Sequence, residues 1–95
     1  MGRTPIHPGE ILSDELSELN IAAAELARAV KVPPKRITQI IAGEISISAD
    51  TALSLGKWFS TGPRLWLNLQ QAYELDLANQ ELKDALDKIK TREAA

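Results

Sequence analysis

The sequence predicts an all-α protein: one domain of about five helices, followed by a helical extension at the C-terminal end. Apolar residues recur at the three- and four-residue spacing of helices through most of the chain. Prolines also stand where new helices are expected to begin. The one alternating segment, Ile45 to Ser48, is only four residues long and follows Gly43 closely, so we expect an extended loop there and not a strand.

The first helix is expected to begin at Pro8, because a proline in the first turn lacks only an amide hydrogen that the helix leaves unpaired. A stripe at i, i+4 and i+7 spacing runs along it: Ile11, Leu12, Glu15, Leu16 and Leu19. Asn20 and Ile21 are expected to end it.

The second helix is expected to run from about Ala22 to Val30. Its start is poorly capped, because Ala22 has no side-chain oxygen to accept a hydrogen bond from an unpaired amide. Its inner face consists of Ala23, Leu26, Ala27 and Val30.

After the turn Lys31 to Pro33, the third helix is expected to begin at Pro34 and to end before Gly43. Its buried residues are expected to be Ile37, Ile40 and Ile41.

The fourth helix is expected to begin after Ser48 as its N-cap, with Asp50 in the first turn, where a negative charge favours the helix dipole. Its inner face consists of Ala52, Leu55, Gly56 and Phe59. Pro63 then opens a fifth helix with one stripe of Trp66, Leu69, Gln70 and Tyr73.

This helix is expected to continue towards residue 90 with a short heptad-like seam: Leu75, Ala78, Leu82, Ala85 and Ile89. The seam covers too few heptads to diagnose a coiled coil, and packing on the same domain is an equal alternative. We assign residues 1–79 to the helical domain and residues 80–95 to the extension and tail, in which residues 91–95 are expected to fray.

Composition bounds the function. The chain has 95 residues, of which 44% are hydrophobic and 25% charged, as expected for one folded domain. It has no cysteine, which excludes disulfides and thiolate chemistry. No apolar run approaches the roughly 20 residues that span a bilayer, and the first ten residues lack a signal-peptide core, so we expect a cytoplasmic protein with no membrane partner.

Enzyme readings of the sequence are weak. The single histidine, His7, has no nearby partner for a catalytic triad or a metal site, and we expect its role to be structural or incidental. The acidic pairs Glu15 with Glu18 and Asp84 with Asp87 share helix faces that are polar enough to be solvated surface. We therefore expect no catalysis, no metal and no cofactor.

The charge distribution points to another function. The net charge is −2, which argues against indiscriminate binding of nucleic acid. Between Leu26 and Gly43, however, every charged residue is basic: Arg28, Lys31, Lys35 and Arg36. Such a cluster is either a solvated helix face or a phosphate-binding surface.

A helix-turn-helix explains the cluster. Such a motif joins two short helices by a turn of three or four residues and lays the second in the major groove of DNA. With the isoleucines inward, the opposite face of the third helix carries Lys35, Arg36, Thr38 and Gln39. Lysine can donate to guanine, glutamine can pair with adenine, and threonine offers a hydroxyl or methyl contact. Arg36 is alternatively a phosphate ligand, together with Arg28, Lys31 and the amides around Ile45 to Ser48, where Ser46 and Ser48 are the candidate residues. The other alternative is an ordinary surface helix.

With these residues in place, the chain resembles the HigA-type antitoxins, a branch of the phage-repressor-like helix-turn-helix superfamily. The resemblance covers roughly residues 6–80. It rests on HPGEIL at 7–12, ELARAVKV at 25–32, RITQIIAG at 36–43, ISADTALSL at 47–55 and PRLWLNLQQAYEL at 63–75. The last segment, together with HPGE, is the most specific.

The resemblance implies a homodimer that binds double-stranded operator DNA of its own operon. It also implies a partner, a HigB-type toxin, which is a small ribonuclease that cleaves messenger RNA on the ribosome. The positions that contact bases in such repressors match Pro34, Lys35 and Gln39 here. The chain departs from the family at Pro34, which makes only apolar contacts, at Ala22, where a polar cap is usual, and at Lys31, where glycine is common.

The fifth helix admits two interpretations. Trp66 and Leu69 are expected to close the core over the first and fourth helices. For a dimer interface the candidates are Leu67, Tyr73, Leu75, Ala78 and Leu82. Two functions besides the antitoxin remain open: a stand-alone transcriptional repressor, and a protein-interaction module that has lost DNA binding.

Overall fold

The computed structural model describes residues 4–92, which form five helices and no strand. The helices are α1 (Pro8–Leu19), α2 (Ala23–Val30), α3 (Pro34–Ile41), α4 (Ala49–Phe59) and α5 (Pro63–Asp87). The all-α prediction is therefore confirmed, and Pro8, Pro34 and Pro63 each occupy the first residue of a helix as expected. Of the tail predicted to fray, residues 93–95 lie outside the described residues.

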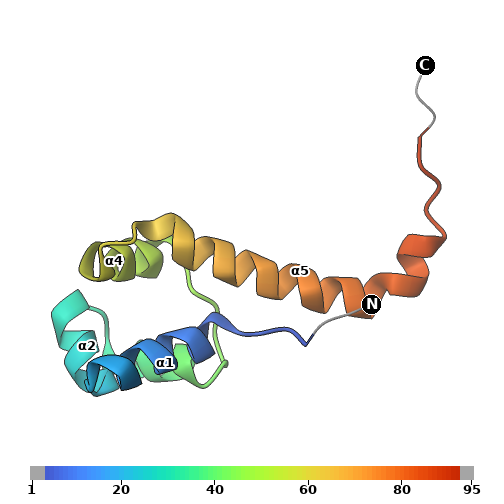
Figure 1. The fold of residues 1–95 in the computed structure, drawn as a ribbon. Helices are drawn as coiled ribbons and strands as arrows, with labels where there is room; N and C mark the ends of the chain where they lie inside the picture. Colours follow the sequence, from blue (N-terminus) through green and yellow to red (C-terminus); the bar gives the residue numbers. More distant parts are fainter. Residues whose placement is uncertain (1–3, 93–95) are drawn as a thin grey trace.

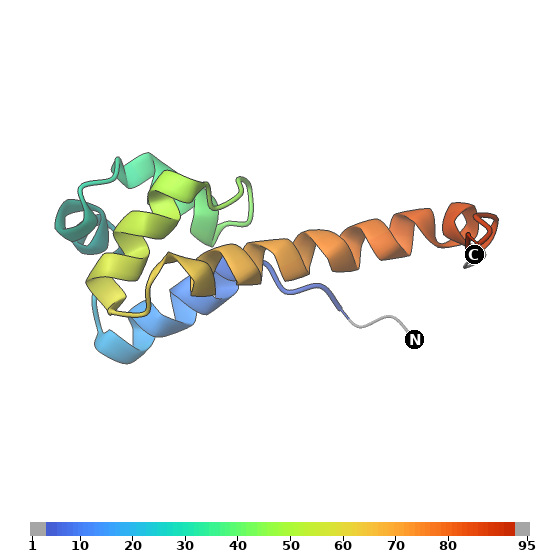
Figure 2. The same cartoon turned by 90° about the horizontal axis from the view of Figure 1, so that it is seen from above.

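Helices α1 to α4 form a bundle that the first turns of α5 complete, and the rest of α5 projects away from it (Figure 1 and Figure 2). The radius of gyration is 16.5 Å. A compact chain of this length would have about 12 Å. The difference reflects the projecting end of α5, which makes the molecule 53 Å long but only 27 × 21 Å across.

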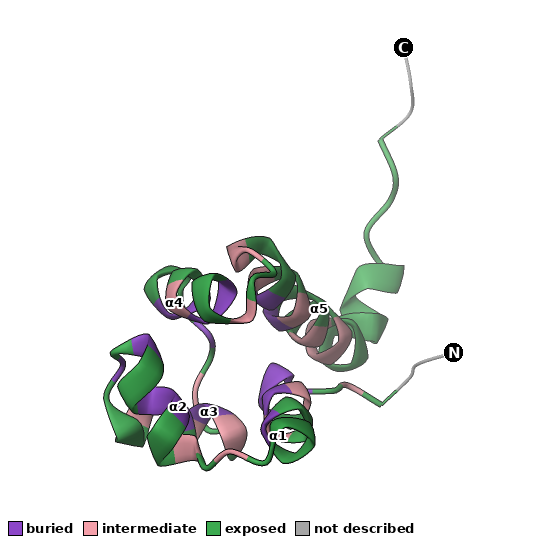
Figure 3. Cartoon of the chain, turned by 60° about the vertical axis from the view of Figure 1, so that its left-hand side comes forward, coloured by how far each residue is buried: buried purple, intermediate pink, exposed green. Residues whose placement is uncertain are grey.

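The core lies between the four short helices and the start of α5, where the buried residues gather (Figure 3). Five leucine and isoleucine side chains of the core are fully inaccessible to solvent: Leu12, Leu26, Ile37, Ile40 and Leu55. Burying each such side chain stabilises the fold by about 1.5–3 kcal/mol relative to exposing it. Trp66 closes this core from α5 with 1% of its surface exposed, as predicted.

Leu19 corrects the expected inner stripe of α1, because it is 52% exposed. The helix ends at Asn20, whose φ of 56° lies in the left-handed region, and the amide of Ile21 donates to the carbonyl of Leu16 at 3.0 Å. This reversal of the chain brings Ile21 against the core. Ile21 therefore takes the place that the helical spacing had assigned to Leu19.

Gly9 sets how closely α1 crosses α3. A Cβ atom at this position would lie only 1.8 Å from the carbonyl oxygen of Ile40. No larger residue fits without moving one of the two helices, because the oxygen and carbon atoms of Ile40 that the Cβ atom would overlap belong to the backbone of α3. The glycine thus fixes the C-terminal end of α3 against the start of α1.

His7 has a structural role, which was one of the two expected roles. Its Nδ1 accepts a hydrogen bond from the amide of Gly9 at 2.9 Å and so caps the N-terminus of α1. Its ring is 8% exposed and meets Tyr73 of α5 edge to face, with centroids 4.8 Å apart. The HPGE segment therefore joins α1 to α5 and supports the end of α3.

The outer part of α5 makes little use of its apolar side chains within the chain. Leu75, Leu82, Leu86 and Ile89 are 59%, 49%, 43% and 68% exposed. The helix runs unbroken past residue 79, and all residues from 79 to 92 are exposed. The division of the chain at residues 79 and 80 stays a prediction.

Within the described part of the chain, α5 is the only helix of 18 residues or more, and it is too polar to cross a membrane.

Candidate nucleic-acid interface

The helix-turn-helix consists of α2, the turn Lys31 to Pro33, and α3. Ala27, which was expected on the inner face of α2, is 1% exposed, and its small side chain leaves room for α3 to cross α2. Val32 is buried in the corner, and its amide donates to the carbonyl of Ala27 at 3.1 Å. Lys31 has φ 59° and ψ 41°, a left-handed conformation in which the side chain of any residue but glycine is strained.

Helix α3 buries one face and exposes the other. Ile37 and Ile40 are completely buried, whereas Pro34, Lys35 and Thr38 are exposed and Gln39 is half-buried. The hydroxyl of Thr38 donates to the carbonyl of Lys35 at 2.9 Å, so its methyl group and oxygen lone pairs remain for a ligand. Ile41 is only half-buried at the edge of the core. The face that the sequence assigned to bases is therefore open to solvent.

The basic residues expected at phosphates lie in different surroundings. Arg28 and Lys31 are exposed at the end of α2. Arg36 is half-buried and forms an ion pair with Asp50 at the start of α4, with 3.3 Å between Nη1 and Oδ2. This partner lies 14 residues further along the chain, and no local pattern around Arg36 indicated it.

The loop from α3 to α4 is held by α5, through a residue whose role the sequence reasoning missed. The amide of Ile47 donates to Oε1 of Gln70 at 2.8 Å, and Nε2 of Gln70 donates to Glu74 at 2.9 Å. Ser46 reaches the same Glu74 carboxylate at 3.5 Å. Gln70 is only 5% exposed. A polar residue within the apolar stripe of α5 was the available signal.

These contacts correct one expectation about the loop. The amides around Ile45 to Ser48 were expected to bind phosphate, but the amide of Ile47 is buried and already paired with Gln70. A buried amide with a good partner would lose that bond in order to meet a phosphate. Ile47 is therefore a fixing point of the loop and not a phosphate ligand.

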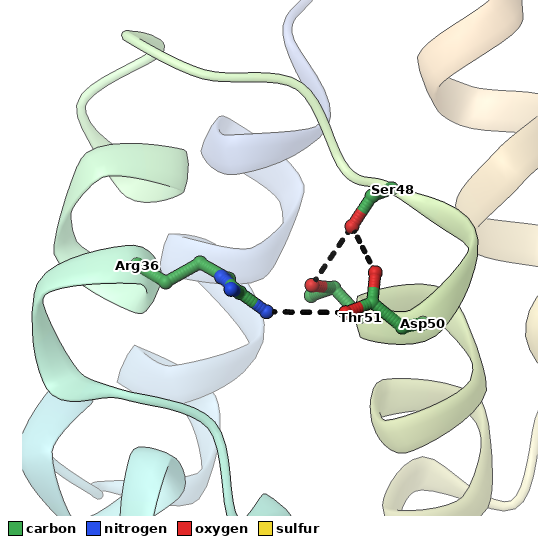
Figure 4. Close-up of polar contacts among 4 residues, drawn as sticks. All are labelled: Arg36, Ser48, Asp50 and Thr51. Atoms are coloured by element: carbon green, nitrogen blue, oxygen red, sulfur yellow. Dashed lines mark hydrogen bonds and ion pairs between the residues drawn. The ribbon is translucent and has the colours of Figure 1, made fainter.

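Ser48 occupies the N-cap position of α4, as predicted, but its side chain does not cap the helix. Its hydroxyl donates instead to the carboxylate of Asp50 and lies 3.2 Å from the hydroxyl of Thr51 (Figure 4). The hydrogen bond from Ser48 is the main reason that the pKa of Asp50 lies below its usual value. Desolvation, the next largest cause, raises this pKa, and the Thr51 amide and the charge of Arg36 lower it by smaller amounts.

The residues expected at a dimer interface fall into two groups. Leu67 packs against the core and Tyr73 packs on His7, so both are half-buried within their own chain. Leu75 and Leu82 are exposed and Ala78 is half-buried on the outer part of α5. The second group is available to another chain, and the first is partly used by the fold.

No group of side chains that could hold a metal ion is found in residues 4–92. Histidine and acidic side chains in this range do not gather in a group of three that could hold a metal ion. The pairs Glu15 with Glu18 and Asp84 with Asp87 are exposed, as expected for solvated surface.

Comparison with known proteins identifies relatives along most of the chain. No protein-family model matches it. The chain is 46% identical over 77 residues to virulence-associated protein I of Dichelobacter nodosus, covering 80% of this chain and 71% of that protein. An addiction module antidote protein of the HigA family from Coxiella burnetii superimposes with a TM-score of 0.91 at 44% identity, over 96% of this chain and 100% of the other. The Pseudomonas aeruginosa antitoxin HigA, solved with the higBA promoter, gives a TM-score of 0.86 at 43% identity, over 92% and 97% of the two chains.

Proposed function

Because the chain belongs to the HigA family of antitoxins, which have the helix-turn-helix repressor fold, we propose that it binds the operator of its own operon and represses transcription from it. Antitoxins of this family are not enzymes, in agreement with the composition and the motifs of the sequence. The proposal also includes a homodimer and a second activity, neutralisation of a HigB-type toxin that cleaves messenger RNA.

One observation carries the DNA-binding part of the proposal. Helix α3 has its two central isoleucines fully buried and exposes Lys35 and Thr38, with Gln39 half-buried beside them. Lysine, threonine and glutamine together can contact guanine, thymine and adenine in the major groove. Pro34 adds an apolar contact, and Arg28 and Lys31 supply positive charge for the flanking phosphates.

Titration of the purified protein onto its own upstream DNA tests this part. Between about 50 and 200 mM salt, log Kd should rise linearly with log salt, with a slope of about 0.9 for each phosphate contact. DNA of shuffled sequence is the control, and it should bind at least about a thousandfold more weakly. Equal affinity for both sequences at every salt concentration contradicts specific operator binding.

The dimer is proposed to form through the outer part of α5, where Leu75, Ala78 and Leu82 lie along one seam. A dimer would place two recognition helices about 34 Å apart, one turn of DNA, and so allow a palindrome to be contacted. Sedimentation should show a dimer for the wild type and a monomer for Leu82→Asp. The matched control is Leu53→Asp, which changes an exposed leucine of α4, 60% exposed against 49% for Leu82. A Leu82→Asp chain that stays dimeric contradicts this interface.

The toxin partner is tested separately. Co-expression with the neighbouring gene should yield a complex that co-purifies with this chain and should relieve the growth arrest caused by that gene alone. A neighbouring product that neither binds the chain nor arrests growth favours a stand-alone repressor. Stable partner binding without any operator binding at low salt favours an interaction module instead.

A further inference from the structure

A polar cluster links α3, the helix proposed to enter the major groove of DNA, to the start of α4. It consists of Arg36 from α3 and of Ser48, Asp50 and Thr51 (Figure 4). Asp50 is its centre: one carboxylate oxygen, Oδ2, lies 3.3 Å from Nη1 of Arg36, and the other, Oδ1, accepts from the hydroxyl of Ser48. Both oxygens of a single carboxylate are thus engaged by two side chains that the sequence had assigned to DNA phosphates.

A carboxylate and a phosphate diester present the same chemistry to these two groups. Each offers anionic oxygens that accept charge-assisted hydrogen bonds from a guanidinium and a hydroxyl. Each is also favoured at a helix N-terminus, and Asp50 lies in the first turn of α4. One donor nitrogen of Arg36 and the hydroxyl proton of Ser48 are therefore engaged by an internal anion where an external anion would otherwise bind.

The cluster is accessible enough to be displaced. The side chain of Asp50 is 72% exposed and that of Arg36 is 40% exposed, so water and ions reach the pair. Exposed ion pairs of this kind are weak. A phosphate approaching α3 would compete with Asp50 for Arg36 on comparable terms and would also be repelled by the carboxylate that it displaces.

We propose that Asp50 is an internal competitor of the operator phosphate: it occupies Arg36 and Ser48 in the free protein and must release them when DNA binds. This inference rests on the proposed DNA-binding function and adds a residue that tunes it. Asp50 then lowers the affinity for DNA and keeps repression reversible. The hydrogen bond from Ser48 lowers the pKa of Asp50, so the competing charge is present throughout the neutral range.

Operator titrations with Asp50→Asn test the inference, because this change removes the charge and keeps the size of the side chain. The variant should bind the operator roughly fivefold more tightly at low salt, the scale of an exposed ion pair. The slope of log Kd against log salt should stay close to that of the wild type, because Arg36 contacts the phosphate in both complexes once it has left Asp50. A melting curve establishes that the variant is folded.

The matched control is Glu44→Gln, which removes one negative charge from an exposed residue of the loop that precedes α4. It reports how much affinity rises from net charge alone, and its salt slope should equal that of the wild type. In an Arg36→Ala background, Asp50→Asn should do no more than Glu44→Gln does. The NMR signals of the Arg36 side chain in the free protein should shift on Asp50→Asn and stay in place on Glu44→Gln.

The other outcomes overturn the inference. Weaker operator binding by Asp50→Asn would mean that the carboxylate orients Arg36 towards DNA. An effect equal to that of Glu44→Gln, or one that persists without Arg36, would mean that Asp50 affects operator binding only through the net charge of the protein. If the wild type and both variants bind no operator, the proposed function fails and the inference with it. Binding by Asp50→Asn alone supports both.

Discussion

Replacement of Lys31 by glycine is expected to stabilise the fold and to weaken DNA binding at the same time. Lys31 follows the last residue of α2, and its φ of 59° lies in the left-handed region. Its amide still donates to the carbonyl of Ala27, so the turn depends on the backbone conformation and not on the lysine side chain. The side chain itself is exposed and is a candidate phosphate ligand.

The two effects have separate magnitudes. A residue with a Cβ atom in this conformation costs about 1–2 kcal/mol. Glycine removes that strain but loses about 0.5–1 kcal/mol more conformational entropy on folding. The net gain should be about 0.5–1 kcal/mol, which raises Tm by about 2–8 °C in a domain of this size. Loss of one phosphate contact should lower the salt slope of operator binding by about 0.9.

Lys31→Ala separates the two contributions, because it removes the charge but keeps the strained Cβ atom. Thermal unfolding should rank Lys31→Gly above both the wild type and Lys31→Ala. Operator titrations at several salt concentrations should give both variants the same reduced slope. The reasoning is refuted if Lys31→Gly melts no higher than Lys31→Ala, or if both variants keep the wild-type slope.

Three further changes test other parts of the structure. Gly9→Ala should destabilise the protein by about 1–3 kcal/mol or more, because the new Cβ atom would lie 1.8 Å from the carbonyl oxygen of Ile40; an unchanged Tm contradicts the close crossing. Gln70→Leu should cost about 1–3 kcal/mol, since it leaves the buried amide of Ile47 unpaired, whereas the same change at the exposed Gln71 should cost little. The folded protein lowers the pKa of Asp50, so ionisation of this carboxyl group favours folding. Any stability advantage of the wild type over Asp50→Asn should be complete above the unfolded-state pKa of about 3.9. It should be lost as the pH falls through the lower pKa of the folded protein. If Tm depends on pH in the same way for the wild type and Asp50→Asn, ionised Asp50 does not contribute to the stability of the fold.

The sequence predicted the helices well, because their starts carry local signals. A proline at the first position needs no tertiary partner to begin a helix, and the three such prolines marked three helices correctly. Asn20 ended α1 as expected because asparagine tolerates the left-handed conformation. The prediction for Leu19 was wrong because helical spacing does not include the chain reversal at Asn20, which turns Ile21 to the core.

The site was predictable only where it depends on one helix. The buried and exposed faces of α3 follow from the spacing of its isoleucines. The partners of Arg36, Ile47 and Ser46 lie 14, 23 and 28 residues further along the chain, and contacts at such separations exist only once the helices have packed. Local sequence therefore identified Arg36 as basic and exposed, but not as paired with a carboxylate.

Operator binding by the double variant Lys35→Ala with Gln39→Ala tests the central claim most directly. Its matched control is Lys83→Ala with Gln71→Ala, which removes the same two residue types from exposed positions of α5. Each lost base contact should cost about 1–3 kcal/mol, so the α3 variant should bind its operator at least about thirtyfold more weakly and lose preference over shuffled DNA. The control should bind like the wild type. Equal operator affinity of the two double variants, both folded, would contradict the assignment of this face of α3 to DNA.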